Sequence, residues 1–261
     1  MIRLGVVSFY NSRPLIHGLE ADSQITLRFD VPSRLAARLH EKEVDAALVP
    51  VVDYARAGDA WQTVSDACIA CDGPTLTVRV FARRPAEQLR RLHVDGDSHT
   101  SVVLARLLWE RWFARPVEIV PYDVPGGPDA CEAVLLIGDK VVQAAPRGFP
   151  YQIDLGQAWK DWTGLPFVFA VWAARASGDW AYLARRLSEA RDRGTADPAG
   201  IAQRYGPALG WPVALAEAYV RRFMRYVLTP EARAGMERFV REAQAAGCVP
   251  AAAWRGEVRS G

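Results

Sequence analysis

The first 60 residues alternate between apolar segments of strand length and segments with helical spacing. The segment 2–9 is apolar almost without interruption, which is typical of a strand buried on both faces. The segment 24–30 carries apolar side chains at every second position and predicts another strand, and 45–49 predicts a third. Strands that alternate with helices predict a parallel sheet.

Short polar residues mark the starts of the helices expected between these strands. Asn11 and Ser12 precede Pro14, a residue that suits a first helical turn. Ser33 precedes Leu35 and Leu39, which lie four residues apart on one helix face. We therefore expect Asn11, Ser12 and Ser33 to cap two helices.

A second series of strands and helices follows, and then a tail with helical spacing. Ser98 is expected to cap a helix, and the pattern from 178 onward is helical, with Leu215, Tyr219, Phe223 and Tyr226 on one face. Strands are predicted over 76–81, 92–94, 117–120, 133–137 and 167–173.

Two α/β units with a helical tail predict a bilobal α/β architecture, a periplasmic-binding-protein-like fold of type II. The strands 76–81 and 167–173 would be the two crossings between lobes. The first lobe would comprise 1–78 and 172–261, including the tail, and the second lobe 79–171. A ligand cleft is expected between the lobes, where parallel strands end.

Composition limits the partners. The 261 residues are 50% hydrophobic and 24% charged, with a net charge of +2, as in a packed globular protein. This balance gives no reason to expect a nucleic-acid or anionic-membrane partner. No segment approaches the roughly 18 apolar residues of a membrane span. The N-terminus lacks the pattern of a secretory signal, so we expect a cytoplasmic protein. The oligomeric state stays open.

No sequence signal indicates a cofactor. Cys68 and Cys71 are spaced like a ligand pair, but no second pair follows, so we interpret them as buried, reduced thiols. The histidines are scattered, so no metal site is expected. Phosphate-binding glycine loops and the motifs of common hydrolases are absent.

The stretch Ser98-His99-Thr100-Ser101 combines a predicted helix start with three hydroxyl groups. Backbone N–H groups and the helix dipole make such a start a potential anion site, although the sequence alone favours plain capping. Asn11, Ser12 and Ser33 stand at equivalent positions in the first lobe. Polar helix starts on both lobes would suit a small carboxylate ligand without a basic patch.

Seven ordered stretches together resemble one family, the chorismate dehydratases of the futalosine route to menaquinone (the MqnA family). They cover roughly residues 2–173, and the tail agrees only in character. They read VSFYNSRPL from 7, VPS from 31 with DAALVP from 45, DGPTLTV from 72, DSHTS from 97, LLIGD from 135, DLG from 154, and WTGLPFVFA from 162.

The resemblance implies elimination of water from chorismate, giving 3-[(1-carboxyvinyl)oxy]benzoate. Aromatisation drives this reaction, so the resemblance implies no cofactor. It implies Asn11 and Thr77 as the catalytic residues, with threonine in place of the usual serine. The resemblance, together with the polar helix starts, assigns substrate contacts to Ser12, Ser33, Ser98, His99, Thr100, Ser101, Gly138, Asp139, Gly164 and Pro166.

Two points stay open at this stage. His99 replaces the family's arginine, and no acid–base pair is evident, so the proton acceptor is unassigned and one of the substrate's own carboxylates is a candidate. The alternatives are a non-catalytic binding protein for a small carboxylate and the sister enzyme of the same route, dihydroxynaphthoate synthase.

Overall fold

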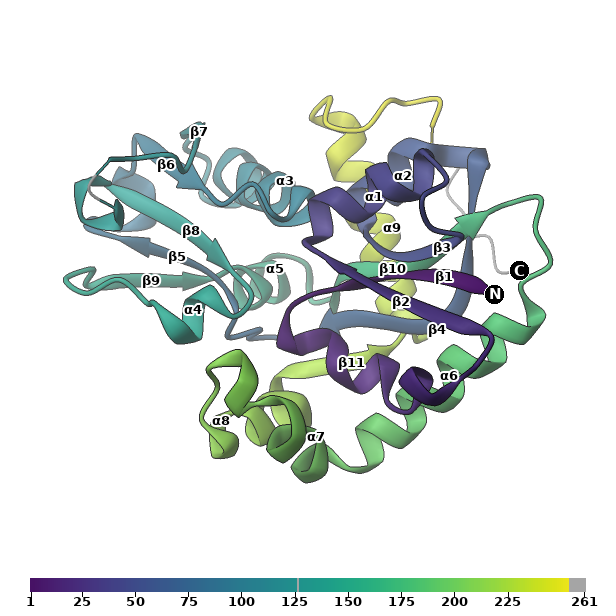
Figure 1. Cartoon of the computed structure of the whole chain (residues 1–261). Coiled ribbons are helices and arrows are strands. Elements are labelled where there is room, and N and C mark those ends of the chain that lie inside the picture. The colour runs from purple at the N-terminus through teal and green to yellow at the C-terminus, as the bar shows by residue number, and fades with distance from the viewer. Residues whose placement is uncertain (126, 254–261) are drawn as a thin grey trace.

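Two sheets lie side by side in the computed structural model, which describes residues 1–125 and 127–253 (Figure 1). We call each sheet with its helices a lobe, the six-stranded lobe and the five-stranded lobe. The six-stranded sheet has the order β11-β4-β10-β3-β1-β2, and the other has the order β7-β6-β8-β5-β9. The strands of the first are β1 (Ile2–Val7), β2 (Ile25–Asp30), β3 (Ala46–Pro50), β4 (Trp61–Cys71), β10 (Phe167–Arg175) and β11 (Met224–Val227). Those of the second are β5 (Val78–Ala82), β6 (Arg91–Val94), β7 (Glu118–Pro121), β8 (Ala133–Ile137) and β9 (Tyr151–Asp154).

The helices cover the sheets and line the space between them. In Figure 1, α1 and α2 lie above the six-stranded sheet and α6 runs below it. The α-helices are α1 (Pro32–His40), α2 (Val51–Ala57), α3 (His99–Leu107), α4 (Lys140–Gln143), α5 (Leu155–Thr163), α6 (Ala181–Ala196), α7 (Pro198–Tyr205), α8 (Val213–Ala218) and α9 (Pro230–Ala245). A 3₁₀ helix, η1, spans Tyr10–Ile16, and a π-helical turn, η8, spans Tyr219–Phe223.

The predicted parallel pairing is present. β1 pairs in parallel with β2 and β3, and β6 pairs in parallel with β7 and β8. β10 returns antiparallel between β3 and β4, completing the six-stranded sheet. The expectation of two lobes of this kind is thereby confirmed, whereas the division at 78/79 and 171/172 into separate domains stays a prediction.

The crossings are irregular segments and not the strands that were expected. The strand predicted over 76–81 begins only at Val78, and the chain passes between the sheets in the non-strand segment 72–77. Leu76 has a φ of 65°, which a strand does not allow, and two backbone N–H groups in this segment donate to a side chain instead of to a neighbouring strand. The second crossing occupies 164–166, just before β10.

Two expected helix caps are absent. Asn11 and Ser12 lie inside η1, whose N-cap residue is Phe9. Ser33 is the second residue of α1, after Pro32, and the N-cap is Val31. Pro32 begins α1 one residue before Ser33, because its fixed φ already suits a first turn, whereas η1 begins at Tyr10 and contains Pro14. Ser98 does cap α3 and accepts a hydrogen bond from the Ser101 N–H.

One segment of the tail that was predicted to be helical is a strand. Residues 224–227 form β11, which pairs antiparallel with β4, so the prediction of a helix through Tyr226 is wrong. Met224 and Tyr226 are buried while Arg225 and Val227 are exposed, the alternation of a strand at a sheet edge. The edge of β4 supplies hydrogen-bond partners that outweigh local helix propensity here.

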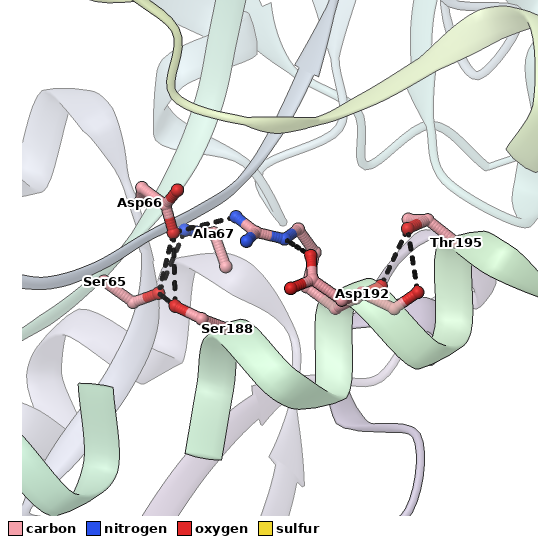
Figure 2. Close-up of polar contacts among 7 residues, drawn as sticks. Ser65, Asp66, Ala67, Ser188, Asp192 and Thr195 are labelled. Atoms are coloured by element: carbon pink, nitrogen blue, oxygen red, sulfur yellow. Dashed lines mark hydrogen bonds and ion pairs between the residues drawn. The ribbon is translucent and has the colours of Figure 1, made fainter. Parts of the chain in front are cut away.

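The first of the two 16-residue tail helices, α6, is attached to an irregularity of β4. The pairing of β4 with β10 shifts register around residues 64–67, and Ser65 and Asp66 lie there opposite α6 (Figure 2). Arg191 of α6 is 7% exposed and donates to Asp66 Oδ1 over 2.8 Å, and the hydroxyl groups of Ser188 and Ser65 lie 3.1 Å apart. The tail is thus fixed to the six-stranded lobe.

The cysteine interpretation agrees with the structure. Cys68 and Cys71 are free thiols on β4, fully buried in the core, and burial raises the pKa of both. They are packing residues of the strand.

Candidate functional site

A cavity lies between the two lobes, with about 460 Å³ of space between atoms, part of which is open to solvent. Its lining comes from β1, β3, β4, β5, β8, β10 and β11, from the starts of α1, α2 and α3, and from η1 and η8. Both lobes therefore contribute walls, and a ligand inside would be enclosed on several sides.

The walls are mostly apolar, and one of them depends on a glycine. Gly138 follows β8 with a φ of 61°, and a Cβ added there would be 2.6 Å from Cδ2 of Phe9. Phe9 and Gly138 both line the cavity from opposite lobes. The close approach of ring and backbone needs a residue without a side chain.

Asn11 supplies a polar group without a protein partner. It lies on η1, lines the cavity, and its Oδ1 atom is buried with no hydrogen-bond partner among the described residues. Buried polar atoms in proteins are nearly always satisfied. Asn11 Oδ1 is therefore free to accept a hydrogen bond from a ligand hydroxyl.

Thr77 is the last residue of the first crossing segment, 72–77, and lines the cavity. Its Oγ1 lies 2.7 Å from the phenolic oxygen of Tyr219, which also lines the cavity. Tyr219 is 1% exposed and begins η8. Sequence analysis did not identify Tyr219 as a site residue, because it lies 142 positions from Thr77 and reads as one more apolar helix position.

Asp154 holds the crossing segment that carries Thr77. Its carboxylate accepts the N–H of Thr75 at 2.9 Å and that of Leu76 at 2.8 Å, and it also caps α5. Burial raises the pKa of Asp154, while the N–H groups and Arg79 oppose that rise. The DLG stretch at 154 is part of the family resemblance. In the folded chain its Asp154 holds the crossing segment and caps α5.

Ser98 and Ser101 present hydroxyl groups at the N-terminus of α3. Both line the cavity, and their Oγ atoms are 3.0 Å apart. The first N–H groups of a helix have no partner within it, and the helix dipole favours an anion there. These residues suit a carboxylate, as the sequence indicated.

The described lining contains no Asp, Glu, His, Lys or Arg. Its one group with a shifted pKa is the Tyr219 phenol, whose pKa is raised by burial, so it stays protonated. The cavity therefore offers neutral hydrogen-bonding groups and a helix terminus, not an ionised base.

Asp139 lies next to the cavity wall and ties the lobes together. It is absent from the lining; its Oδ1 accepts the N–H of Tyr10 at 3.0 Å and the indole N–H of Trp211 at 2.9 Å. Burial raises the pKa of Asp139, and the two donors and Arg13 oppose that rise. The carboxylate expected to touch substrate is already bonded to protein.

Three further predicted residues also make contacts between the lobes. His99 Nδ1 is 2.8 Å from Asp53 Oδ2, and Thr100 Oγ1 accepts the Val52 N–H at 3.2 Å. The Ser33 N–H donates to the backbone oxygen of Asp97 over 2.9 Å. His99, Thr100 and Ser33 are absent from the lining.

Ser12, Gly164 and Pro166 are also absent from the lining. The Ser12 hydroxyl donates to the Val7 oxygen at 2.6 Å, Gly164 is an exposed C-cap of α5 with a φ of 73°, and the Pro166 oxygen accepts the Trp159 indole N–H. Of the twelve predicted site residues, the cavity brings together Asn11, Thr77, Ser98, Ser101 and Gly138.

Within the described part of the chain, no group of three or more His, Cys, Asp or Glu side chains is arranged to hold a metal ion. Over the same residues, each helix is too short or too polar to cross a membrane.

Comparisons with known proteins agree with this architecture. The chain is 31% identical to the chorismate dehydratase of Thermus thermophilus, an alignment that covers 90% of this chain and 93% of that protein. A solved protein of Archaeoglobus fulgidus superposes with a TM-score of 0.72 at 17% identity, covering 95% of this chain and 98% of that one. The periplasmic aliphatic sulphonate binding protein of Escherichia coli superposes with a TM-score of 0.65 at 15% identity, covering 95% and 93%.

The two structures share the fold, which is the periplasmic-binding-protein-like α/β fold expected from the sequence. A family model described as menaquinone biosynthesis matches residues 2–245, nearly the whole described chain. By this match, and by its likeness to the Thermus enzyme, the chain belongs to the menaquinone biosynthesis family.

Proposed function

We propose that this chain is a chorismate dehydratase, a hydro-lyase that converts chorismate to 3-[(1-carboxyvinyl)oxy]benzoate in the cytoplasm, as a step of menaquinone biosynthesis. The observation that carries the proposal is the neutral cavity between the lobes, with the unpartnered Asn11 Oδ1 atom and the α3 terminus on its walls. The Thermus relative's activity supports it.

The reaction removes the proton from C3 of the ring and the hydroxyl group from C4, and the ring becomes aromatic. The protein's task is to hold the ring, exclude bulk water and stabilise the leaving oxygen. Asn11 and Thr77 are the proposed contacts of the C4 hydroxyl group. Ser98 and Ser101 are the proposed contacts of one substrate carboxylate, with the α3 dipole behind them.

The proton from C3 needs an acceptor. Because the described lining carries no Asp, Glu, His or Lys and Tyr219 stays protonated, the substrate's own second carboxylate is the proposed acceptor. The proton and the leaving hydroxide then depart together as water, so charge and atoms balance.

The test is to incubate the purified protein with chorismate and to identify the product by mass spectrometry, with and without prior EDTA treatment. We expect a product lighter by one water that keeps the enolpyruvyl group, and equal rates in both samples. A heat-denatured sample controls for spontaneous decay of chorismate.

One outcome favours the alternative of a binding protein. Unchanged chorismate that nevertheless raises the Tm of the folded protein would indicate a non-catalytic carboxylate receptor. A folded protein that neither converts chorismate nor shows a Tm shift in its presence would favour the sister enzyme of the same route.

A further inference from the structure

Tyr219 is built into the cavity wall by a cluster of aromatic rings. Its ring centroid lies 4.8 Å from that of Trp211 and 6.2 Å from that of Tyr10. All three side chains are at most 3% exposed. The π-helical turn that Tyr219 begins is a local irregularity of a kind often found at functional sites.

One hydrogen bond joins the hydroxyl groups of Tyr219 and Thr77, and the acceptors around each group indicate which of them donates. Thr77 Oγ1 is the one hydrogen-bond partner that the described residues provide for the Tyr219 hydroxyl. If Thr77 donated to Tyr219, no described residue would accept the phenolic proton. If Tyr219 donates, the Thr77 hydroxyl still has an acceptor in the Thr75 oxygen, 3.5 Å from its Oγ1, so both hydroxyl groups are better satisfied. Tyr219 therefore donates, and Thr77 Oγ1 accepts.

This direction decides what Thr77 can offer a ligand. A threonine hydroxyl has one proton and two lone pairs, and one lone pair is occupied by Tyr219. The other acceptor near the Thr77 proton is the Thr75 oxygen at 3.5 Å, the limit of a hydrogen bond. The proton is thus available to the cavity.

We propose that Tyr219 is a positioning residue that directs the Thr77 hydroxyl proton at the leaving oxygen of the substrate. The inference rests on the proposed function and adds a residue to it. Tyr219 acts through Thr77, so its removal should matter only while the Thr77 hydroxyl is present.

A double-mutant cycle tests this dependence with Tyr219→Phe, Thr77→Val and the double variant. We expect Tyr219→Phe to lower kcat about tenfold or more with KM changed less than about threefold. In the Thr77→Val background, adding Tyr219→Phe should cause no further loss. Thr77→Ser, which restores the hydroxyl that Thr77→Val lacks, should recover the kcat lost in Thr77→Val.

The matched control is Tyr226→Phe. Tyr226 is 5% exposed, and its hydroxyl is buried without a partner among the described residues, so the same atom is removed from a similar environment. Its kcat should equal that of the wild type. Losses from Tyr219→Phe and Thr77→Val that multiply in the double variant would overturn the inference while leaving the proposed function intact.

Neutron diffraction on the wild-type protein tests the proton position without any variant and without turnover. The deuterium between the two oxygens should be bonded to Tyr219 Oη. A Thr77 deuterium that points at Tyr219 Oη would overturn the inference whatever the reaction is. A folded wild type that leaves chorismate unchanged would instead overturn the proposed function and the substrate role of this pair together.

Discussion

The indole N–H of Trp211 donates to Oδ1 of Asp139 over 2.9 Å, and this bond joins the tail of the six-stranded lobe to the end of β8 in the other lobe. The same oxygen accepts the Tyr10 N–H. One buried carboxylate atom therefore receives two donors from the opposite lobe and holds the cavity closed.

Replacing Asp139 by leucine should destabilise the closed protein. The variant leaves the N–H groups of Tyr10 and Trp211 buried without an acceptor, at about 1–3 kcal/mol for each. Urea unfolding at neutral pH measures the loss, and KM for chorismate should rise because closure becomes less favourable. A variant as stable as the wild type would show that the lobes hold together without this contact.

The pH dependence of stability should identify the same group. Burial raises the pKa of Asp139, so the native state holds its proton more tightly than the unfolded state, whose pKa is about 3.9. This contribution to stability is fully present below the unfolded pKa and is lost as pH rises through the native pKa.

Asp139→Asn keeps an acceptor at this position but does not titrate. The free energy of unfolding of the wild type minus that of Asp139→Asn should therefore fall as pH rises from about 4 through the raised pKa, and then level off. The measurement is urea unfolding of both proteins over this range. A difference that stays constant with pH would contradict the raised pKa.

Gly138→Ala should abolish most activity. The new Cβ would lie 2.6 Å from the Phe9 ring, and a φ of 61° costs a non-glycine residue roughly 1–2 kcal/mol. The lobes would have to separate at the cavity wall. Gly247→Ala is the matched control, because its φ is 70° with no atom within 4 Å of the added Cβ. It should lose similar backbone stability and keep its turnover of chorismate.

Under the proposed function, Asn11→Ala should lower kcat on the order of 10²–10³, because the side chain would bind the leaving oxygen. Tm should change little, since Asn11 Oδ1 has no hydrogen-bond partner among the described residues. Ser12→Ala provides the contrast on the same 3₁₀ helix. Its hydroxyl donates to the Val7 oxygen, so its loss should cost about 1 kcal/mol of stability at unchanged kcat. Full turnover by Asn11→Ala would move the catalytic assignment to Thr77 or to the substrate itself.

Ser101→Ala should raise KM for chorismate far more than it lowers kcat. A hydrogen bond to a charged group contributes about 1.5–3 kcal/mol, which corresponds to roughly 10- to 150-fold in binding. The helix cap is retained, because the acceptor in it is the Ser98 Oγ atom. Steady-state kinetics measure the two constants, and an unchanged KM would place the carboxylate elsewhere.

Local sequence signals predicted the parts of this protein whose partners are close in the chain. β8 has the bounds that its uninterrupted apolar run predicts, and Ser98 caps α3 because its acceptor oxygen and the Ser101 N–H are three residues apart. The order of strands and helices was sufficient for the bilobal fold, and the ordered motifs were sufficient for the family.

The tertiary structure decided which residues face the cavity and which fasten the lobes together. Asp139, His99 and Thr100 carry groups suited to a ligand, yet each is bonded to the opposite lobe. Tyr219 has the spacing of a core residue, yet it meets Thr77 across 142 positions. A side chain's type states which bonds it can make, and only the packing of distant segments determines whether protein or ligand makes them.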